Sequence, residues 1–175
     1  MINDEEIYKT FSTDKEKGFR LLMNTYQKPV YYFIRRMVVV HDDAEDIMQE
    51  TFIRMYRTFD SFRKECALQT WLFKIASNEC LRFLHSQNME QAELQNELTN
   101  KLMASEYIDY DNEMAVKFQN AIISLPEKQR LVFNLRYYDE LEYSEISKIT
   151  DMKVETLKVN YHYAKENIKK YIINE

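Results

Sequence analysis

The chain has 175 residues, a length that suits one ordinary domain or two small ones. Hydrophobic residues make up 45% and charged residues 30%, so the chain can bury a core, and its composition argues against wholesale disorder. One Gly and two Pro are too few for the turns of a β-rich fold, and a single Gly cannot form a glycine-rich phosphate loop. We therefore predict an all-α fold and exclude P-loop and dinucleotide-binding chemistry.

The net charge of −5 argues at first against a nucleic-acid-binding protein, but the acidic side chains are unevenly distributed. Residues 86–115 carry one basic and seven acidic side chains, and the segments on either side are close to neutral. This segment is rich in Gln, Asn and Glu and poor in aromatic residues, which is typical of a linker, although leucines every four residues between 94 and 102 fit a solvated helix equally well. We expect two small helical domains joined by an acidic linker, with domains at residues 1–87 and 114–175 and the linker at 88–113.

Neither a membrane segment nor a resident cofactor is expected. No stretch of about 18 or more apolar residues occurs, and the first residues are acidic where a signal peptide would be basic, so we expect a soluble, cytoplasmic protein without membrane insertion. Cys66 and Cys80 lack the spacing of a zinc site or a disulfide framework. No Ser/His/Asp or Cys/His set has a positional logic for catalysis. We predict no metal, no cofactor and no catalytic residue.

The first block is expected to hold two helical segments, the first at 19–39 and bent or interrupted near Pro29. The second begins after Val40, where Asp42 offers an N-cap with Glu45 three residues on. Apolar residues recur along one face of this second helix, and the opposite face is acidic. That acidic face suits either solvent or a basic partner protein. A carboxylate-bridged metal enzyme is the alternative, although the Glu-x-x-His pattern of helical metal sites is absent.

Residues 60–68 interrupt the helical period and predict a loop, after which a helix resumes at 69–85. The segment from Phe62 to Arg82 mixes aromatic with basic and amide side chains. Aromatic rings stack unpaired bases, and cations follow the phosphates of a single strand. The alternative is that Trp71 and Phe73 simply belong to the hydrophobic core.

The last 60 residues carry the most regular pattern. Leu125, Pro126 and Glu127 predict a helix start with Pro at the first helical position. A short helix with apolar residues between 143 and 149, a turn at Asp151, and a long amphipathic helix from 154 to 171 form a helix-turn-helix layout. Asp151 must adopt whatever left-handed geometry the turn needs, since no Gly is present. A plain helical hairpin is the alternative, and the basic exposed face of the long helix favours DNA binding.

Taken together, these motifs resemble those of bacterial sigma factors, specifically the small two-domain extracytoplasmic-function type. Four segments carry the resemblance in the same order and spacing, and they are Asp43–Phe52, Thr70–Asn78, Leu125–Arg130 and Val154–Lys158. The resemblance implies a promoter-specificity subunit that binds core RNA polymerase, recognises the minus-ten and minus-thirty-five promoter elements and starts DNA melting. It also implies an anti-sigma factor as a further partner.

The resemblance assigns roles to residues at the matching positions. Those expected to bind core polymerase are Asp43, Asp46, Gln49, Glu50 and Phe52. Those expected to melt promoter DNA and hold a flipped base are Phe62, Trp71, Lys74, Asn78 and Arg82. Those expected to contact duplex DNA from the helix-turn-helix are Lys153, Glu155, Thr156, Lys158, Asn160 and His162. The alternative function is a free-standing helix-turn-helix regulator that binds duplex DNA without polymerase and has no use for the acidic helix.

Overall fold

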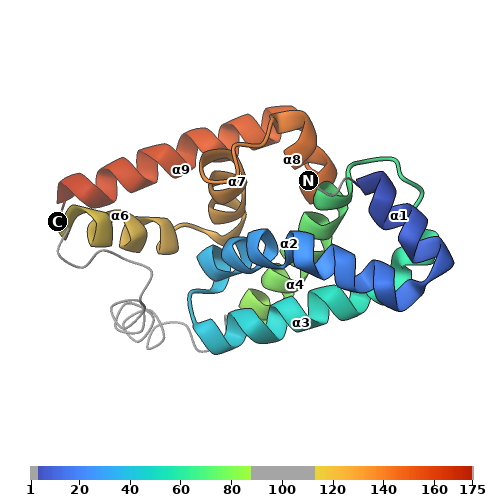
Figure 1. Ribbon diagram of the computed structural model, residues 1–175. Helices are drawn as coiled ribbons and strands as arrows, with labels where there is room; N and C mark the ends of the chain where they lie inside the picture. The colour runs from blue at the N-terminus through green and yellow to red at the C-terminus, as the bar shows by residue number, and fades with distance from the viewer. Residues whose placement is uncertain (1–3, 88–112, 175) are drawn as a thin grey trace.

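The computed structural model describes residues 4–87 and 113–174, and within these ranges all regular structure is helical (Figure 1). The predicted all-α fold is confirmed. Except for Glu113, the first residue of α6, the predicted linker lies outside the described residues, and so does the prediction of its helicity. The helices are α1 (Asp4–Thr13), α2 (Lys15–Val38), α3 (His41–Thr58), a single 3₁₀ turn η1 (Phe59–Ser61), α4 (Leu68–Gln87), α6 (Glu113–Ile123), α7 (Glu127–Tyr137), α8 (Tyr143–Thr150) and α9 (Val154–Asn174).

Helix α2 differs from its expected form because it runs without interruption through Pro29. Leu22 before the proline and Val30 and Phe33 after it are all fully buried, so one continuous apolar stripe packs on the core. Pro29 itself lies on the exposed face, where water can satisfy the carbonyl that its missing N–H leaves unbonded. The free energy gained by packing this apolar stripe on the core therefore exceeds the free-energy cost of a proline inside the helix.

The starts of α3 and α7 also differ from the expected ones. Asp42 is not the N-cap of α3, because Val40 holds that position and its carbonyl accepts the Ala44 N–H at 3.0 Å. Asp42 lies instead in the first turn, where its charge suits the positive end of the helix dipole. Pro126 is the N-cap of α7 rather than its first residue. The expected loop after α3 is present apart from η1, and α4 begins close to its expected start.

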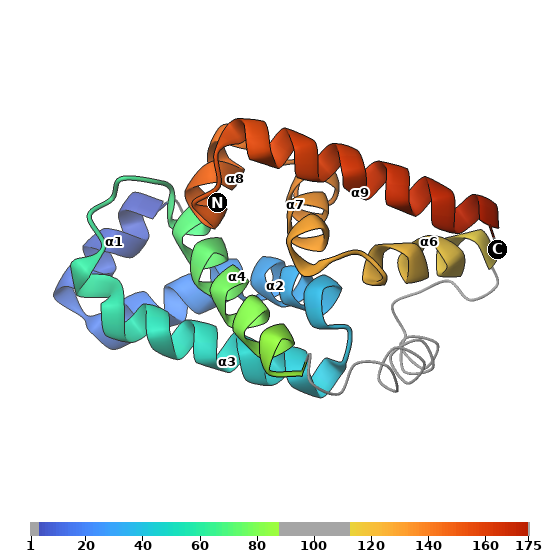
Figure 2. The same cartoon turned by 180° about the vertical axis from the view of Figure 1, so that it is seen from behind.

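The two halves of the chain pack directly on one another. Figures 1 and 2 show α7 and α8 lying between the long helix α9 and the pair α2 and α4. One buried cluster contains the core of α1 to α4 together with Leu131, Leu135, Ile146 and Leu157 from the second half. A second, smaller cluster joins α6, α7 and α9 around Phe133. The predicted layout of two helical domains is present, and α2, α4, α7 and α8 also share one hydrophobic interior between them.

Candidate nucleic-acid interface

Helix α3 presents an outward stripe of polar side chains. Its inward face is fixed by Ala44 and Met55, which are fully buried, so residues three and four apart on the opposite side face solvent. Asp46 and Gln49 are exposed, whereas Asp43 is only half-buried and turned toward the edge of the helix. The predicted acidic surface therefore exists as a continuous stripe.

One residue predicted to face a partner lies elsewhere. Phe52 is 2% exposed and packs edge-on against Phe19 at 6.5 Å between ring centroids, so it supports α3 from inside and cannot contact a partner protein directly. The exposed apolar residue of this helix is Ile53, at 42% exposure. Its spacing of four residues from Gln49 and seven from Asp46 places it on the outward stripe, a signal that the sequence analysis missed.

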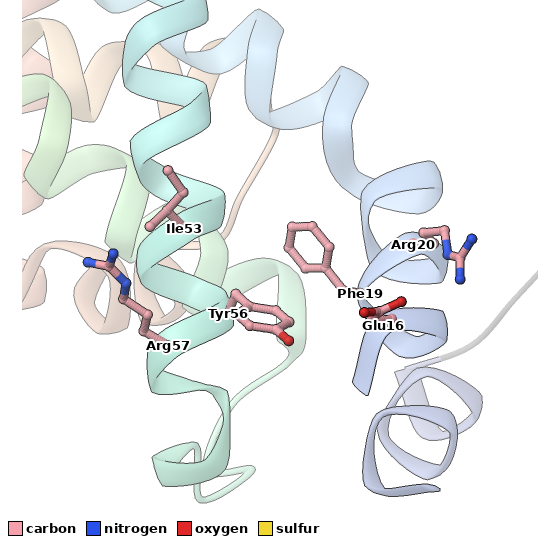
Figure 3. Close-up of a pocket in the computed structure, with 6 residues that line it drawn as sticks. All are labelled: Glu16, Phe19, Arg20, Ile53, Tyr56 and Arg57. Atoms are coloured by element: carbon pink, nitrogen blue, oxygen red, sulfur yellow. The ribbon is translucent and has the colours of Figure 1, made fainter. Parts of the chain in front are cut away.

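Ile53 borders a groove of about 620 Å³ between α2 and α3 (Figure 3). The floor is apolar, with Phe19 from α2 and Tyr56 from α3, whose rings meet edge to face at 5.1 Å. Arg57 on α3 and Arg20 on α2 stand at its rim. The groove continues the outward stripe of α3, so acidic, apolar and basic side chains follow one another along a single surface.

The predicted aromatic residues of the melting segment do come together. Phe62 stacks on Trp71 with ring centroids 4.6 Å apart, and both are half-buried. Tyr8 of α1, which the sequence analysis did not single out, also stacks on Phe62, with ring centroids 5.7 Å apart. The Lys64 ammonium lies 4.3 Å from the Tyr8 ring centroid, a cation–π contact at the edge of this column. Trp71 therefore lies at the border of the hydrophobic core and is partly exposed. Phe73 is 1% exposed and belongs to the core, as the alternative interpretation predicted.

Helix α1 also fixes the start of α4. The Asp4 carboxylate accepts the backbone N–H of Leu68 at 3.0 Å, which satisfies one of the unbonded donors of the first turn of α4. The Tyr26 hydroxyl donates to the same carboxylate. Burial and the nearby Asp4 carboxylate raise the pKa of both Tyr8 and Tyr26.

Lys74, Asn78 and Arg82 follow Trp71 along one face of α4 at spacings of three and four residues. Asn78 and Arg82 are exposed, whereas Lys74 is half-buried and donates to Asp151 at 2.8 Å. Arg82 is ion-paired with Glu79, a carboxylate that is only 5% exposed and also receives Arg54 of α3 at 2.7 Å. Glu79 therefore ties α3 to α4 and fixes the relative position of the two candidate surfaces.

The helix-turn-helix forms as predicted. Asp151 ends α8 in the left-handed conformation, with φ 58° and ψ 16°, and its N–H donates to the Ser147 carbonyl at 2.9 Å. Ile146, Ile149 and Leu157 fill the angle between α8 and α9 and are almost fully buried. The turn therefore forms without Gly, because Asp tolerates the left-handed region better than most residues.

The exposed face of α9 carries most of the predicted DNA-binding residues. The exposed members are Lys153, which lies just before α9, and Glu155, Thr156, Lys158 and His162 on it. Asn160 differs, because it is half-buried and its side-chain amide donates to the Thr156 carbonyl at 2.9 Å within the same helix. Val159 and Tyr163, at 52% and 54% exposure, occupy the outward face instead. The spacing of Val159, three residues after Thr156, was the signal that could have found it.

Residues that could hold a metal do not gather in the described part of the chain. Within residues 4–87 and 113–174 no three His, Cys, Asp or Glu side chains are placed to bind one ion. Both cysteines are free, and burial raises the pKa of the Cys80 thiol. In the same ranges no helix is both long enough and apolar enough to span a bilayer.

Two family models and several curated relatives match this chain. Residues 22–89 match the family model for Sigma-70 region 2, and residues 115–168 match the model for Sigma-70, region 4. The ECF RNA polymerase sigma-E factor of Escherichia coli K12 is 33% identical over 184 residues, covering 95% of this chain and 93% of that protein. The sigma-E factor of Haemophilus influenzae is 30% identical over 182 residues, covering 98% of this chain and 96% of that protein.

Two solved structures share the fold. One is the sigma factor RpoE in complex with the anti-sigma factor NepR from Bartonella quintana, with a TM-score of 0.69 at 21% identity, covering 89% of this chain and 97% of that one. The other is CnrH in complex with the cytosolic domain of CnrY, with a TM-score of 0.72 at 14% identity, covering 98% of both chains. From the two matched regions and the sequence relatives, the chain belongs to the ECF sigma factors of the Sigma-70 family, which are promoter-recognition subunits of RNA polymerase and not enzymes themselves.

Proposed function

We propose that this sigma factor divides its work among three surfaces, carried by an N-terminal domain at 1–87, a linker at 88–113 and a C-terminal domain at 114–175. The outward stripe of α3 binds core polymerase, the aromatic and basic face of α4 melts the promoter, and α9 reads the upstream element as duplex. The observation that supports this assignment best is that all three surfaces exist on one fold, each with exposed side chains of the required chemistry.

The polymerase contact is assigned to Asp46, Gln49 and Ile53, with Glu50 and Asp43 at the edge of the stripe. A basic surface on the polymerase would pair with the carboxylates, and an apolar side chain of that surface would enter the groove beside Ile53. Charged rims around an apolar centre are the usual anatomy of a protein–protein contact.

The melting role is assigned to α4 and the aromatic column beside it. Asn78 is exposed and bears both amide donors and an acceptor, so it can read the edge of an extruded base. Phe62 and Trp71 supply stacking faces, and Lys74 and Arg82 supply cations for the strand. Contacts between the extruded base and such a pocket offset the free energy lost when the base leaves the stack. Promoter melting can therefore follow binding without ATP.

The duplex contact is assigned to the N-terminal half of α9. Lys153, Thr156 and Lys158 suit phosphate contacts, which position the helix without reading sequence. Glu155 and His162 can accept or donate at base edges, and Val159 can contact the methyl group of thymine. Asn160 stays in this set, because its bond to the Thr156 carbonyl uses one amide hydrogen and the amide carries a second hydrogen and an oxygen.

A partner that holds the protein inactive is part of the proposal. The two solved structures described above are sigma factors bound to anti-sigma factors, which supports an anti-sigma partner here. Action on chromosomal promoters places the protein in the cytoplasm. A free-standing helix-turn-helix regulator, the alternative function, would need neither the polar stripe of α3 nor the aromatic and basic face of α4.

A reconstituted transcription assay tests the proposal. Core RNA polymerase with this chain should initiate from specific sites in a genomic fragment library, whereas core polymerase alone should not. Asp46→Arg should weaken association with core polymerase by at least tenfold, because it places a cation where the basic partner needs a carboxylate, and Glu113→Arg on α6 is the matched control. Equal polymerase affinity for the two variants, or no promoter-dependent initiation, would refute the assignment.

A further inference from the structure

The helix-turn-helix of α8 and α9 contains no arginine, because the last arginine of the chain is Arg136 in α7. It therefore has no guanidinium, the planar group that is best suited to two-pronged hydrogen bonds with a guanine edge. Lysine is the remaining side chain that could contact guanine in this way. The positions of the lysines on α9 therefore decide which bases the helix can read.

Three of the four lysines of α9 lie along one border of its exposed face. The buried side of the helix is formed by Leu157, Ala164 and Ile168. At 3.6 residues per turn, position 159 lies on the opposite side, and the three lysines lie about a quarter turn from it. All three are exposed, and they are Lys158, Lys165 and Lys169. A row of cations along this border suits the phosphates of one DNA strand. The fourth, Lys170, lies about 16 Å beyond Val159 along the helix axis.

The centre of the outward face carries apolar and hydrogen-bond-accepting groups instead. Val159 and Tyr163 are 52% and 54% exposed there, and Figures 1 and 2 show the other helices packed along one side of α9 only. The His162 ring meets the Tyr163 ring edge-on, with centroids 5.6 Å apart, which helps to orient the phenol. Glu155 is exposed one turn before Val159. Phosphates would repel its carboxylate, so this side of α9 suits base edges, where Glu155 can accept from an amino group.

The methyl group of thymine is the base-edge group that fits Val159 and Tyr163. It is the one methyl group that a base pair presents in the major groove. Valine has a single strongly preferred rotamer in a helix, so it loses little freedom when it packs on such a methyl group. Tyr163 follows Val159 by about 6 Å along the helix axis, close to the rise of two base pairs at about 3.4 Å each. The two side chains can therefore reach methyl groups about two base pairs apart.

We infer that α9 identifies its DNA element chiefly through thymine methyl groups, with Val159 and Tyr163 as the residues that determine specificity. This inference rests on the proposed contact between α9 and duplex DNA, and it names the class of duplex that α9 takes. That duplex presents thymine methyl groups about two base pairs apart in its major groove. The lysine border supplies affinity without reading sequence.

Replacement of thymine by deoxyuridine tests the inference, because uracil keeps the base pairing and the O4 acceptor and lacks only the methyl group. Core polymerase with this chain selects promoter fragments from a genomic library, and each upstream element is then synthesised with thymine or with deoxyuridine. Affinity should fall about fourfold for each contacted methyl group, the factor expected when one apolar carbon is no longer buried. At a contacted position, a pair of 5-methylcytosine with guanine should retain more affinity than a pair of cytosine with guanine, since the methyl group stays in the groove.

Two substitutions assign the contacts to side chains. Val159→Ser should abolish the effect of deoxyuridine at one base pair, and Tyr163→Ser should abolish it at a second pair about two steps away. Ile173→Ser is the matched control, because it removes a side chain that is 69% exposed from the same helix, about 21 Å from Val159. The measured quantity is the ratio of affinities for the thymine and deoxyuridine elements, so changes in polymerase affinity or in folding stability cancel.

The inference is overturned if deoxyuridine leaves the affinity unchanged, or if Ile173→Ser alters the ratio as much as Val159→Ser does. Failure of the proposed function gives a different result, because core polymerase with this chain would then select no promoter fragment. In that case the same comparison is made on duplexes that the chain alone selects from a random library. Selection of no duplex in either experiment would overturn both proposals.

Discussion

Gly18, the only glycine of the chain, allows α1 and α2 to cross closely. A methyl group at this position would lie 2.5 Å from the Phe11 Cα and 2.6 Å from the Phe11 nitrogen. These are backbone atoms of α1, so a side-chain rotation cannot relieve the clash, and α1 as a whole must move. The substitution Gly18→Ala therefore tests how α1 is held.

Two effects of opposite sign determine the magnitude. Replacing Gly by Ala within a helix stabilises it by about 1 kcal/mol. Overpacking a close contact costs about 1–3 kcal/mol. Detaching α1 instead would expose Ile7 and Phe11, now 0% and 5% exposed, at about 1.5–3 kcal/mol each, so displacement is the cheaper response. We expect a net destabilisation of about 1 kcal/mol, which lowers Tm by about 2–4 °C for a chain of this size.

The assay is thermal and urea denaturation, with Asn24→Ala at an exposed site of α2 as the control for helix propensity alone. Because Asp4 of α1 bonds the Leu68 N–H, amide hydrogen exchange should also show weaker protection in the first turn of α4. If Gly18→Ala instead stabilises the protein as much as helix propensity predicts, with protection unchanged, the close contact does not control α1 and the reasoning fails.

Two further substitutions test the DNA surfaces. Asn78→Ala should spare core-polymerase binding and impair open-complex formation, since it removes an exposed amide without touching the core; unchanged permanganate reactivity of the promoter would argue against the base-reading role. Lys158→Ala should weaken binding to upstream elements of any sequence, and it should reduce the dependence of log affinity on log salt concentration by about one phosphate contact. Val159→Ser should leave that salt dependence unchanged and alter the preference at one base pair. The same change in slope for both variants would show that Val159 lies outside the groove.

Residue patterning predicted much of the local structure. Apolar spacing and helix-start signals located α2, α3, α4, α7, α8 and α9, although not α1 or α6, and the helix-turn-helix layout placed Asp151 at the left-handed turn that ends α8. These features depend on residues within one or two helical turns, which is why the sequence could specify them. Patterning did not show that Phe52 points inward, because a face that is polar on average does not say which single side chain points outward.

The sequence by itself determined that this protein is all-helical, and its motif order pointed to a sigma factor. Only the tertiary structure decided that the two halves share one interior, that α1 caps α4 through Asp4, and that Glu79 joins α3 to α4. Each of these contacts links residues far apart in the chain. Their partners are selected by the burial of charge and apolar surface in three dimensions, and no local period encodes that selection.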